Sequence, residues 1–232
     1  MRSVDWDEVR ERTIALYARR GAGSGPPDAL SEKQVRDAEA QFGVVFPDDY
    51  RQYLLRVSAG GGRMRTLRFD GSRWDWNGAL PSAHTRMHVD FPDHDTAQAA
   101  SDEVWDRQPQ PGDYASDAAY QADHFVWREA ADASEEDRAT GVVCLTDDGC
   151  GFQTLLVVSG PMRGAMWFDG RAVTESLNPL LNDDGQAATF AEWYLDWLAH
   201  AEVITTREQY LAAHTNWDAG ARKPIWFRWF GS

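Results

Sequence analysis

The sequence is poor in the residues that hold folds together through covalent or metal links. Its 232 residues include only two cysteines, Cys144 and Cys150. Two thiols do not make a disulfide scaffold, and by themselves they cannot complete a tetrahedral zinc site. His84, His88 and His94 lie near one another in the sequence, but their spacing matches metal sites poorly. We therefore expect reduced cysteines, scattered surface histidines, and neither a bound metal nor a cofactor.

Long apolar runs are also missing. No stretch approaches the roughly 20 apolar residues that a membrane helix needs. The N-terminal sequence MRSVDWDEVRER is charged throughout, unlike a secretory signal. An aromatic content of 12%, with 11 tryptophans, is typical of a packed protein and not of a disordered one. The sequence thus predicts a folded, cytoplasmic bacterial protein with no membrane segment.

Positive charge is scarce as well. Lys and Arg number 23 against 37 Asp and Glu, which gives a formal net charge of −14. Most of the excess lies between Asp90 and Ala139, where fourteen acidic residues and three arginines leave a net charge of −11. Such a surface argues against direct binding to nucleic acid, because phosphates require Lys and Arg. It favours a basic partner or, alternatively, nothing more than a solvated acidic loop.

The common catalytic motifs are absent. The glycines at 60–62 lack a following Lys-Ser/Thr and come after a helical pattern, so they do not form a phosphate loop. No Gly-x-Ser-x-Gly elbow occurs. Asp147 and Asp148 precede Gly149, a pattern more typical of a hairpin turn than of an acid–base pair. We predict a protein that is not an enzyme, with an enzyme built on Trp74, Asp147, Asp148 and the histidines as an alternative.

Residues 29–62 predict two short helices joined by a tight elbow. Ser31 and Gln34 form the pattern of a capping box, and Gly43 suits the end of the first helix. Pro47 is pre-set for the start of a second helix, which the three glycines from position 60 end. The side chains expected to form the buried faces are Val35, Ala38, Phe42, Tyr50, Tyr53, Leu54 and Val57.

Other segments predict an N-terminal helix, several strands and closing helices. An amphipathic helix is expected over 4–20, and strands are expected over 64–69, 142–145, 152–158 and 165–168. The apolar run of the third strand suits a central strand covered on both faces. A capping box at 189–192 begins a helix to about His200, whose aromatic face we assign to the core. A last helix is expected over 206–214, before an aromatic tail at 223–230. This tail either packs on the domain, which we favour because exposed aromatic patches are a liability, or offers a segment to a partner.

The acidic segment shows no long periodic pattern. It is rich in Pro, Gly, Ser and Asp around its middle, which indicates a loop. The local patterns predict a short helical turn over 102–108, a loop over 109–122, a strand over 124–127, and an acidic turn or short helix over 130–138.

Three blocks of the sequence occur in an order typical of one protein family. The first runs from Phe42-Gly43 through Phe46-Pro47-Asp48-Asp49-Tyr50 to Tyr53-Leu54-Leu55 and a glycine run. The second is GCGFQTLLVVSG at 149–160 with GAMWFD at 164–169, and the third is FAEWYLDWL at 190–198. These blocks resemble the SUKH superfamily, which includes yeast cell-wall-assembly regulators and many bacterial proteins. Phe46 stands where Leu is usual in that family, and Ser58-Ala59 stand where Asn is common.

The resemblance implies an α+β fold, with a mixed or antiparallel β-sheet packed by N-terminal helices and a C-terminal aromatic helix. We expect a single domain over residues 1–232, with an acidic variable segment at about 90–139 and a C-terminal extension at about 203–232. Bacterial relatives look like immunity proteins, which neutralise a cognate toxin by direct binding. Many such toxins are nucleases with basic clefts, so the implied partner is a basic toxin domain. The yeast relatives imply the alternative, a regulatory scaffold that binds a cellular protein.

The residues expected to bind that partner combine aromatic anchors with acidic charge. Buried tryptophan is enriched among binding hot spots, and charges at the rim of an interface raise association rates. The candidates are Trp74, Trp76, Asp132, Glu135, Glu136, Asp137, Asp147 and Asp148.

Overall fold

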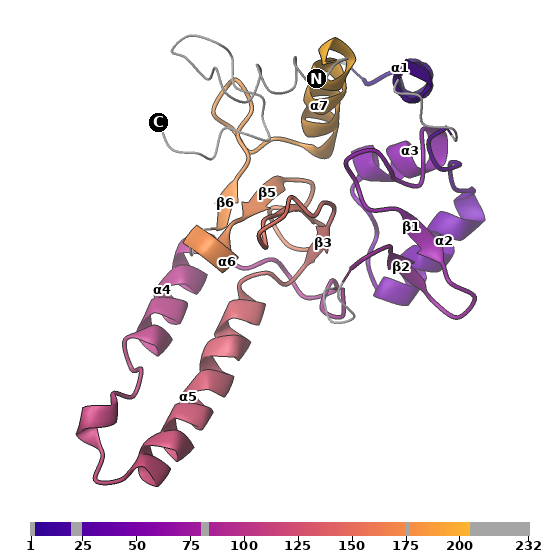
Figure 1. Cartoon of the computed structure of the whole chain (residues 1–232). Coiled ribbons are helices and arrows are strands. Elements are labelled where there is room, and N and C mark those ends of the chain that lie inside the picture. The colour runs from indigo at the N-terminus through magenta and orange to yellow at the C-terminus, as the bar shows by residue number, and fades with distance from the viewer. Residues whose placement is uncertain (1–2, 20–24, 80–83, 175–176, 205–232) are drawn as a thin grey trace.

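The computed structural model describes residues 3–19, 25–79, 84–174 and 177–204 (Figure 1). The described helices are α1 (Trp6–Arg19), α2 (Glu32–Phe42), α3 (Asp48–Arg56), α4 (His94–Trp105), α5 (Asp117–Asp137), α6 (Arg171–Thr174) and α7 (Phe190–Val203), with a 3-10 turn at Pro111–Asp113. The described strands are β1 (Leu67–Phe69), β2 (Trp74–Trp76), β3 (Val142–Cys144), β4 (Gln153–Val157), β5 (Met166–Asp169) and β6 (Leu177–Pro179). The helix expected over 206–214 and the aromatic tail lie outside the described residues.

The strands form two antiparallel sheets. Strands β3, β4, β5 and β6 pair in that order, and Leu156 of β4 lies between Val143 of β3 and Met166 of β5. Strands β1 and β2 form a separate hairpin, whose turn is held by the Asp70 carboxylate accepting the Arg73 N–H at 2.9 Å. Helices packed beside antiparallel strands confirm the α+β prediction.

Strand β4 is buried on both faces, as its apolar run predicts. Successive side chains of a strand point to opposite faces of its sheet. Leu156 contributes to the main core beneath the helices, whereas Leu155 and Val157 pack in a smaller cluster with Phe91 and Trp167. The sheet therefore separates the helical core from the segment that enters α4.

The helices α2 and α3 follow the predicted pattern closely. The Ser31 hydroxyl accepts the Gln34 N–H at 3.3 Å and the Gln34 side chain accepts the Ser31 N–H at 2.8 Å, so the capping box is confirmed. Gly43 ends α2 in the left-handed conformation, at a φ of 70°. Tyr50 and Leu54 of α3 are 1% and 0% exposed, which confirms them as core residues.

The aromatic face of α7 completes the helical core. The capping box at 189–192 is present, and the ring centroids of Tyr50 and Phe190 lie 5.0 Å apart. Those of Tyr53 and Tyr194 lie 4.7 Å apart. Aromatic pairs of this kind contribute about 0.5–1.5 kcal/mol beyond the area they bury. The assignment of this face to the core is confirmed.

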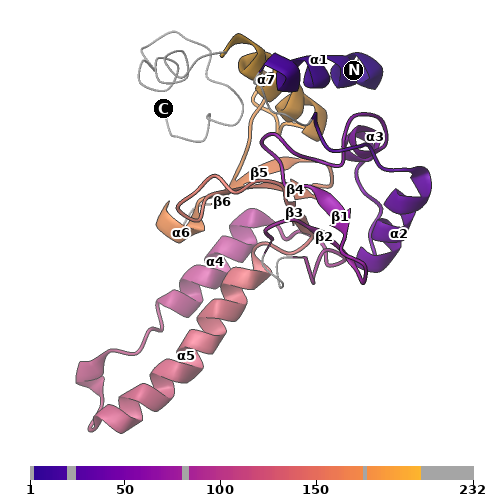
Figure 2. The same ribbon diagram turned by 45° about the vertical axis from the view of Figure 1, so that its right-hand side comes forward.

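Helices α4 and α5 form an antiparallel hairpin, here called the arm (residues 93–138), which projects away from the rest of the molecule (Figures 1 and 2). Its two ends meet at the sheet. The Thr140 hydroxyl donates to the Asp90 carbonyl at 3.0 Å, and the Gly141 N–H donates to the Arg86 carbonyl at 3.1 Å. The arm is thus clamped at one end only.

The arm corrects several predictions made for the acidic segment. The strand predicted over 124–127 is wrong, because α5 is one continuous helix of 21 residues. The loop predicted over 109–122 ends earlier, at Ser116, and the acidic turn or short helix predicted over 130–138 is helical but forms the last part of this longer helix. Ser116 caps it by accepting the Ala119 N–H at 3.3 Å, and alanines favour the helical backbone along its length. The turn predicted at 102–108 overlaps the end of the longer helix α4. Within the described ranges, none of the helices combines the length and apolarity needed to cross a membrane.

Candidate functional site

The two helices of the arm hold each other through a narrow inner face. The Trp127 indole N–H donates to the Val104 carbonyl at 2.9 Å, and the rings of Trp127 and Trp105 meet edge to face with centroids 5.1 Å apart. Ser101 of α4 and Ala131 of α5 are buried between the helices. Because this contact uses only one face of α5, the opposite face is left to solvent.

That outer face of α5 carries four exposed side chains, here called the acidic stripe: Phe125, Glu129, Asp132 and Glu136. Their spacing of four, three and four residues places them on one side of the helix. The Phe125 ring is 62% exposed, although large apolar side chains are usually buried. One aromatic ring in line with three carboxylates matches a partner surface that is apolar at one point and basic around it.

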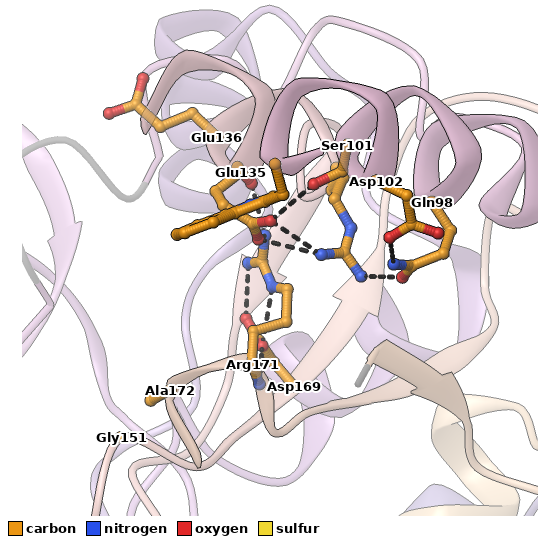
Figure 3. Close-up of a pocket in the computed structure, with 11 residues that line it drawn as sticks. Gln98, Ser101, Asp102, Glu135, Glu136, Gly151, Asp169, Arg171 and Ala172 are labelled. Carbon is orange, nitrogen blue, oxygen red and sulfur yellow. Dashed lines mark hydrogen bonds and ion pairs between the residues drawn. The ribbon is translucent and has the colours of Figure 1, made fainter. Parts of the chain in front are cut away.

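At the root of the arm, Glu135 joins α5 to α4 and to the sheet (Figure 3). Its carboxylate accepts hydrogen bonds from the Ser101 hydroxyl at 2.8 Å, from Arg138 at 2.9 Å and from Arg171 at 3.3 Å. Arg171, which follows β5, also pairs with Asp169 at 2.7 Å. Burial raises the pKa of Glu135, but the Ser101 hydrogen bond and the two arginines outweigh it and hold the pKa below its ordinary value. We therefore assign Glu135 to the support of the arm.

A cavity of about 610 Å³ opens beside this ion-pair network. It is lined by Gln98, Ser101, Asp102, Trp105, Glu135, Glu136, Arg138, Gly151, Asp169, Arg171 and Ala172 (Figure 3). A second cavity of about 260 Å³ shares Glu136, Asp169 and Arg171 with it. The two cavities flank the end of α5, so the surface is concave at the root of the arm.

The predicted acidic residues of the arm fall into two groups. Asp132 and Glu136 are exposed and belong to the acidic stripe. Asp137 forms an ion pair with Arg86 at 2.5 Å, and Glu135 lies in the network at the root. Only the first pair therefore offers unpaired carboxylates to a partner.

The two predicted aromatic anchors lie in the core. Trp74 and Trp76 are 6% and 2% exposed, and the Trp76 indole N–H donates to the Tyr50 hydroxyl at 2.9 Å. These side chains are packed within the protein itself and present almost no surface to a partner. Phe125 is an exposed aromatic residue of the arm that the sequence reasoning missed. The sequence signal that could have revealed Phe125 is its spacing, because it lies four residues, about one helical turn, before Glu129.

Asp147 and Asp148 form a turn between β3 and β4. Asp148 pairs with Arg63 at 2.8 Å and also accepts the Thr146 hydroxyl at 2.8 Å. Asp147 accepts the Gly149 N–H at 3.1 Å. These contacts give both carboxylates a structural role in the turn.

The three clustered histidines have separate environments. His84 is 4% exposed, so the prediction of a surface histidine is wrong at this position. Its ring lies 3.1 Å from the Asp75 carboxylate and accepts the Cys144 N–H at 3.3 Å. Burial lowers the pKa of His84 by more than the hydrogen bond to Asp75 raises it. His88 is exposed and His94 is half-buried at the start of α4; in the part of the chain that the structure describes, no three His, Cys, Asp or Glu side chains form a metal-binding group.

The two cysteines are free thiols. Cys144 is buried in β3, and burial raises its pKa to about 11. Cys150 is exposed in the turn that follows. A buried thiol of high pKa is a poor nucleophile, so Cys144 acts as a core residue.

Comparison with known proteins decides the family. The model of the SMI1 / KNR4 family (SUKH-1) matches residues 29–196, which is more than half of the chain. The chain belongs to the SMI1/KNR4 family. The SUKH resemblance is thereby confirmed, and the matched region runs from just before α2 into α7 and includes the arm. No curated protein and no solved structure matches the chain significantly.

Membership of the SMI1/KNR4 family supports a protein-interaction or immunity-type domain. It also supports a role without catalysis. Within such a domain, the arm offers exposed negative charge and an exposed aromatic ring together on one projecting helix. The acidic stripe and the cavity beside it are therefore the candidate functional site.

Proposed function

We propose that the chain is a non-enzymatic immunity-type domain that neutralises a cognate toxin domain, a basic one, by direct binding through the acidic stripe. The observation that carries the proposal is the exposed row of Phe125, Glu129, Asp132 and Glu136 on a projecting helix. A family of protein-interaction domains supports the class of function. The exposed position and the negative charge of the stripe support a partner with a basic surface.

The geometry suits rapid capture of a basic surface. Screening lengths are about 8 Å at physiological ionic strength, so charges act over distance only where they stand clear of neutralising groups. The three carboxylates of the stripe face outward, whereas Glu135 and Asp137 are paired with arginines. Rim charges chiefly set the association rate, and a desolvated aromatic anchor chiefly sets the dissociation rate. We assign the first role to the carboxylates and the second to Phe125.

Charge reversal on the stripe tests the proposal. The variant carries Glu129→Lys, Asp132→Lys and Glu136→Lys. A matched control reverses three exposed carboxylates of α1 and α2, with Glu8→Lys, Glu11→Lys and Asp37→Lys. Both variants have the same net charge, so a difference between them reports the position of the charge. Association with a basic toxin domain that binds the parent protein would be measured at low and at physiological salt.

We expect the stripe variant to associate about tenfold more slowly than the control at low salt, with a flatter salt dependence. Phe125→Ala should accelerate dissociation and leave association nearly unchanged. Equal association rates for the stripe variant and the control would contradict the proposal. Growth rescue of cells that express the toxin separates an immunity protein from a regulatory scaffold, which would bind another protein and give no rescue.

A further inference from the structure

The outer edge of strand β3 is covered by an imidazole ring and a short stretch of chain. In the sheet, β3 lies at one end of the strand order and pairs with β4. The Cys144 N–H of β3 donates to Nε2 of His84 at 3.3 Å. Just before the strand, the Gly141 N–H donates to the Arg86 carbonyl at 3.1 Å. Residues 84–86, here called the edge segment, therefore occupy backbone donors that an unpaired strand edge would expose.

The two ring nitrogens of His84 have fixed and different roles. A carboxylate can only accept, so Nδ1, which lies 3.1 Å from the Asp75 carboxylate, carries a proton. A backbone N–H can only donate, so Nε2, which faces Cys144, carries none. These contacts require the neutral ring in one tautomer, since an imidazolium donates from both nitrogens. A proton on Nε2 would set two donors against each other and break the contact with β3.

The surroundings of the ring oppose its protonation. His84 is 4% exposed, and burial is the main reason that its pKa lies below the ordinary value of 6.5. Among the charged groups near the ring, Asp75 favours the imidazolium, whereas Arg65 and Arg73 oppose it. The Cys144 thiol stays neutral in this range, because burial raises its pKa to about 11. A His84 ring released into water would therefore take up a proton more readily than the buried ring.

The edge segment also holds one side of the arm. Besides its carbonyl contact with Gly141, Arg86 forms an ion pair with Asp137, the last residue of α5. The chain runs from α5 through Gly141 directly into β3 (Figure 1). Met87, which follows the edge segment, is 1% exposed and anchors the chain in the core. Release of the edge segment would thus free three residues and leave the core packed.

We propose that His84 is a pH-sensitive latch between the edge segment and β3. At neutral pH, the unprotonated Nε2 accepts the Cys144 N–H and the edge segment stays on the strand. Below about pH 6.5, protonation of the ring releases the edge segment, which removes both Arg86 contacts and loosens the α5 side of the arm. The latch belongs to the protein itself, so it goes beyond the proposed function and does not depend on the partner.

The direction of the pH effect follows from the proton affinities of the closed and released forms. The released form binds the proton more tightly, because its His84 ring is in water. Release therefore becomes up to about tenfold more favourable for each pH unit below 6.5, until the ring of the closed form also titrates. Well above pH 6.5 the ring is neutral in both forms, and the pH has no further effect through His84.

Amide hydrogen exchange of the parent protein between pH 8 and pH 5 tests the latch. Protection factors correct for the intrinsic pH dependence of exchange. We expect protection at Gly141 and Cys144 to fall by up to about tenfold per pH unit below 6.5. Because only a short segment opens, exchange at these two amides should not change in low urea. Exchange in β4 requires a larger opening and should accelerate with urea.

Two histidine variants locate the titrating group. Glutamine offers a donor and an acceptor but does not titrate, so His84→Gln should abolish the acid-dependent loss of protection at Gly141 and Cys144. His88→Gln is the matched control, because His88 is exposed four residues along the same stretch, and the loss should remain. The ¹⁵N shifts of the His84 ring in the parent should show a protonated Nδ1 at pH 8 and a pKa below 6.5.

Constant protection at Gly141 and Cys144 down to pH 5 would overturn the proposal, as would the same urea dependence at these amides and in β4. A proton on Nε2 at pH 8 would also overturn it. If His84→Gln fails to fold, the ring shifts and the urea dependence of the parent still decide the question. All of these measurements use the protein alone, so the latch and the acidic stripe fail in different experiments.

Discussion

Replacing Glu135 with glutamine should weaken the attachment of the arm to the sheet. The carboxylate accepts hydrogen bonds from Ser101, Arg138 and Arg171, which belong to three separate parts of the chain. A glutamine has nearly the same shape, but its amide is neutral and offers one acceptor oxygen. The substitution therefore removes charge and acceptors without opening a void.

The expected loss follows from what surrounds the carboxylate. Breaking a fully buried ion pair by removing one partner costs about 3–5 kcal/mol. The Glu135 side chain is 31% exposed, so water replaces part of the lost interaction. Arg171 keeps Asp169 at 2.7 Å, and Arg138 keeps a hydrogen bond to Gln98. We expect a loss of about 2 kcal/mol in the free energy of unfolding.

The assay is urea denaturation, with Glu136→Gln as the matched control. Glu136 is the next residue along the helix and is exposed, so its loss should change the free energy of unfolding by less than about 0.5 kcal/mol. Amide hydrogen exchange would show which part of the protein is destabilised, because local opening of the arm would speed exchange in α4 and α5 more than in β4. Equal stability of the two variants, or equal acceleration in β4, would refute a supporting role for Glu135.

The pH dependence supplies a second readout. The pKa of Glu135 is lowered in the folded protein, so the unfolded chain binds its proton at a higher pH. Its stabilising contribution is present above the unfolded value, near 4.5, and is lost as the pH falls through the folded pKa. The glutamine variant should lack this part of the acid-induced loss.

Leu54→Ala should lower the free energy of unfolding by about 2–5 kcal/mol, because the side chain is 0% exposed, and a loss below about 1 kcal/mol in urea would contradict its core position. Gly60→Ala should cost at least about 2 kcal/mol, since the added Cβ would lie 2.3 Å from the Arg65 carbonyl oxygen. Gly71→Ala also has a positive φ but open space around it, so similar losses for the two glycines in thermal unfolding would argue against the clash. His84 has a lowered pKa, so stability should fall as the pH drops below its ordinary value of 6.5 and the unfolded chain takes up the proton. Urea midpoints from pH 8 to pH 5 should fall less steeply in His84→Gln, and parallel curves would refute this origin.

The parts of the fold that the sequence predicted well are those coded by neighbouring residues. The capping boxes at 31–34 and 189–192 each join residues three apart, and both are present. The stop at Gly43 depends only on its own backbone freedom. The two-sided burial of 152–158 follows from an unbroken apolar run. Sequence patterns of this kind can be recognised without knowing how the rest of the chain folds.

The arm was missed because its helices are specified differently. The buried face of α5 uses alanine and aromatic residues where aliphatic ones are usual, and Ala131 is its single fully buried residue among those described. The run His124–Trp127 contains Phe, Val and Trp, which favour strands when read locally. Helix propensity summed over 21 residues, together with the cap at Ser116, outweighs that short run. Strand β6 was also missed, because it is short and ends in Pro179.

The sequence predicted which types of residue form the candidate site, but it did not predict how these residues are arranged in space. Asp132 and Glu136 are exposed as expected, whereas Glu135, between them in the same acidic run, supports the arm. Arg171 lies 36 residues from Glu135, so no local pattern could have paired them. Trp74 looked like a surface anchor because tryptophan is common at interfaces, yet the same ring fills cores equally well.

The clamp at the root of the arm has a consequence for how far the arm can vary. The hydrogen bond between Thr140 and Asp90 holds the two ends of the hairpin together. The arm is therefore attached to the sheet as a closed loop, whatever its length. Lengthening such a loop costs little, about 0.6 kcal/mol for each doubling. Substitutions in the outer part of the hairpin, away from the contacts of Glu135, should therefore leave the core undisturbed. Replacing the arm between Asp90 and Thr140 with the arm of a relative should transfer that relative's choice of partner to this protein.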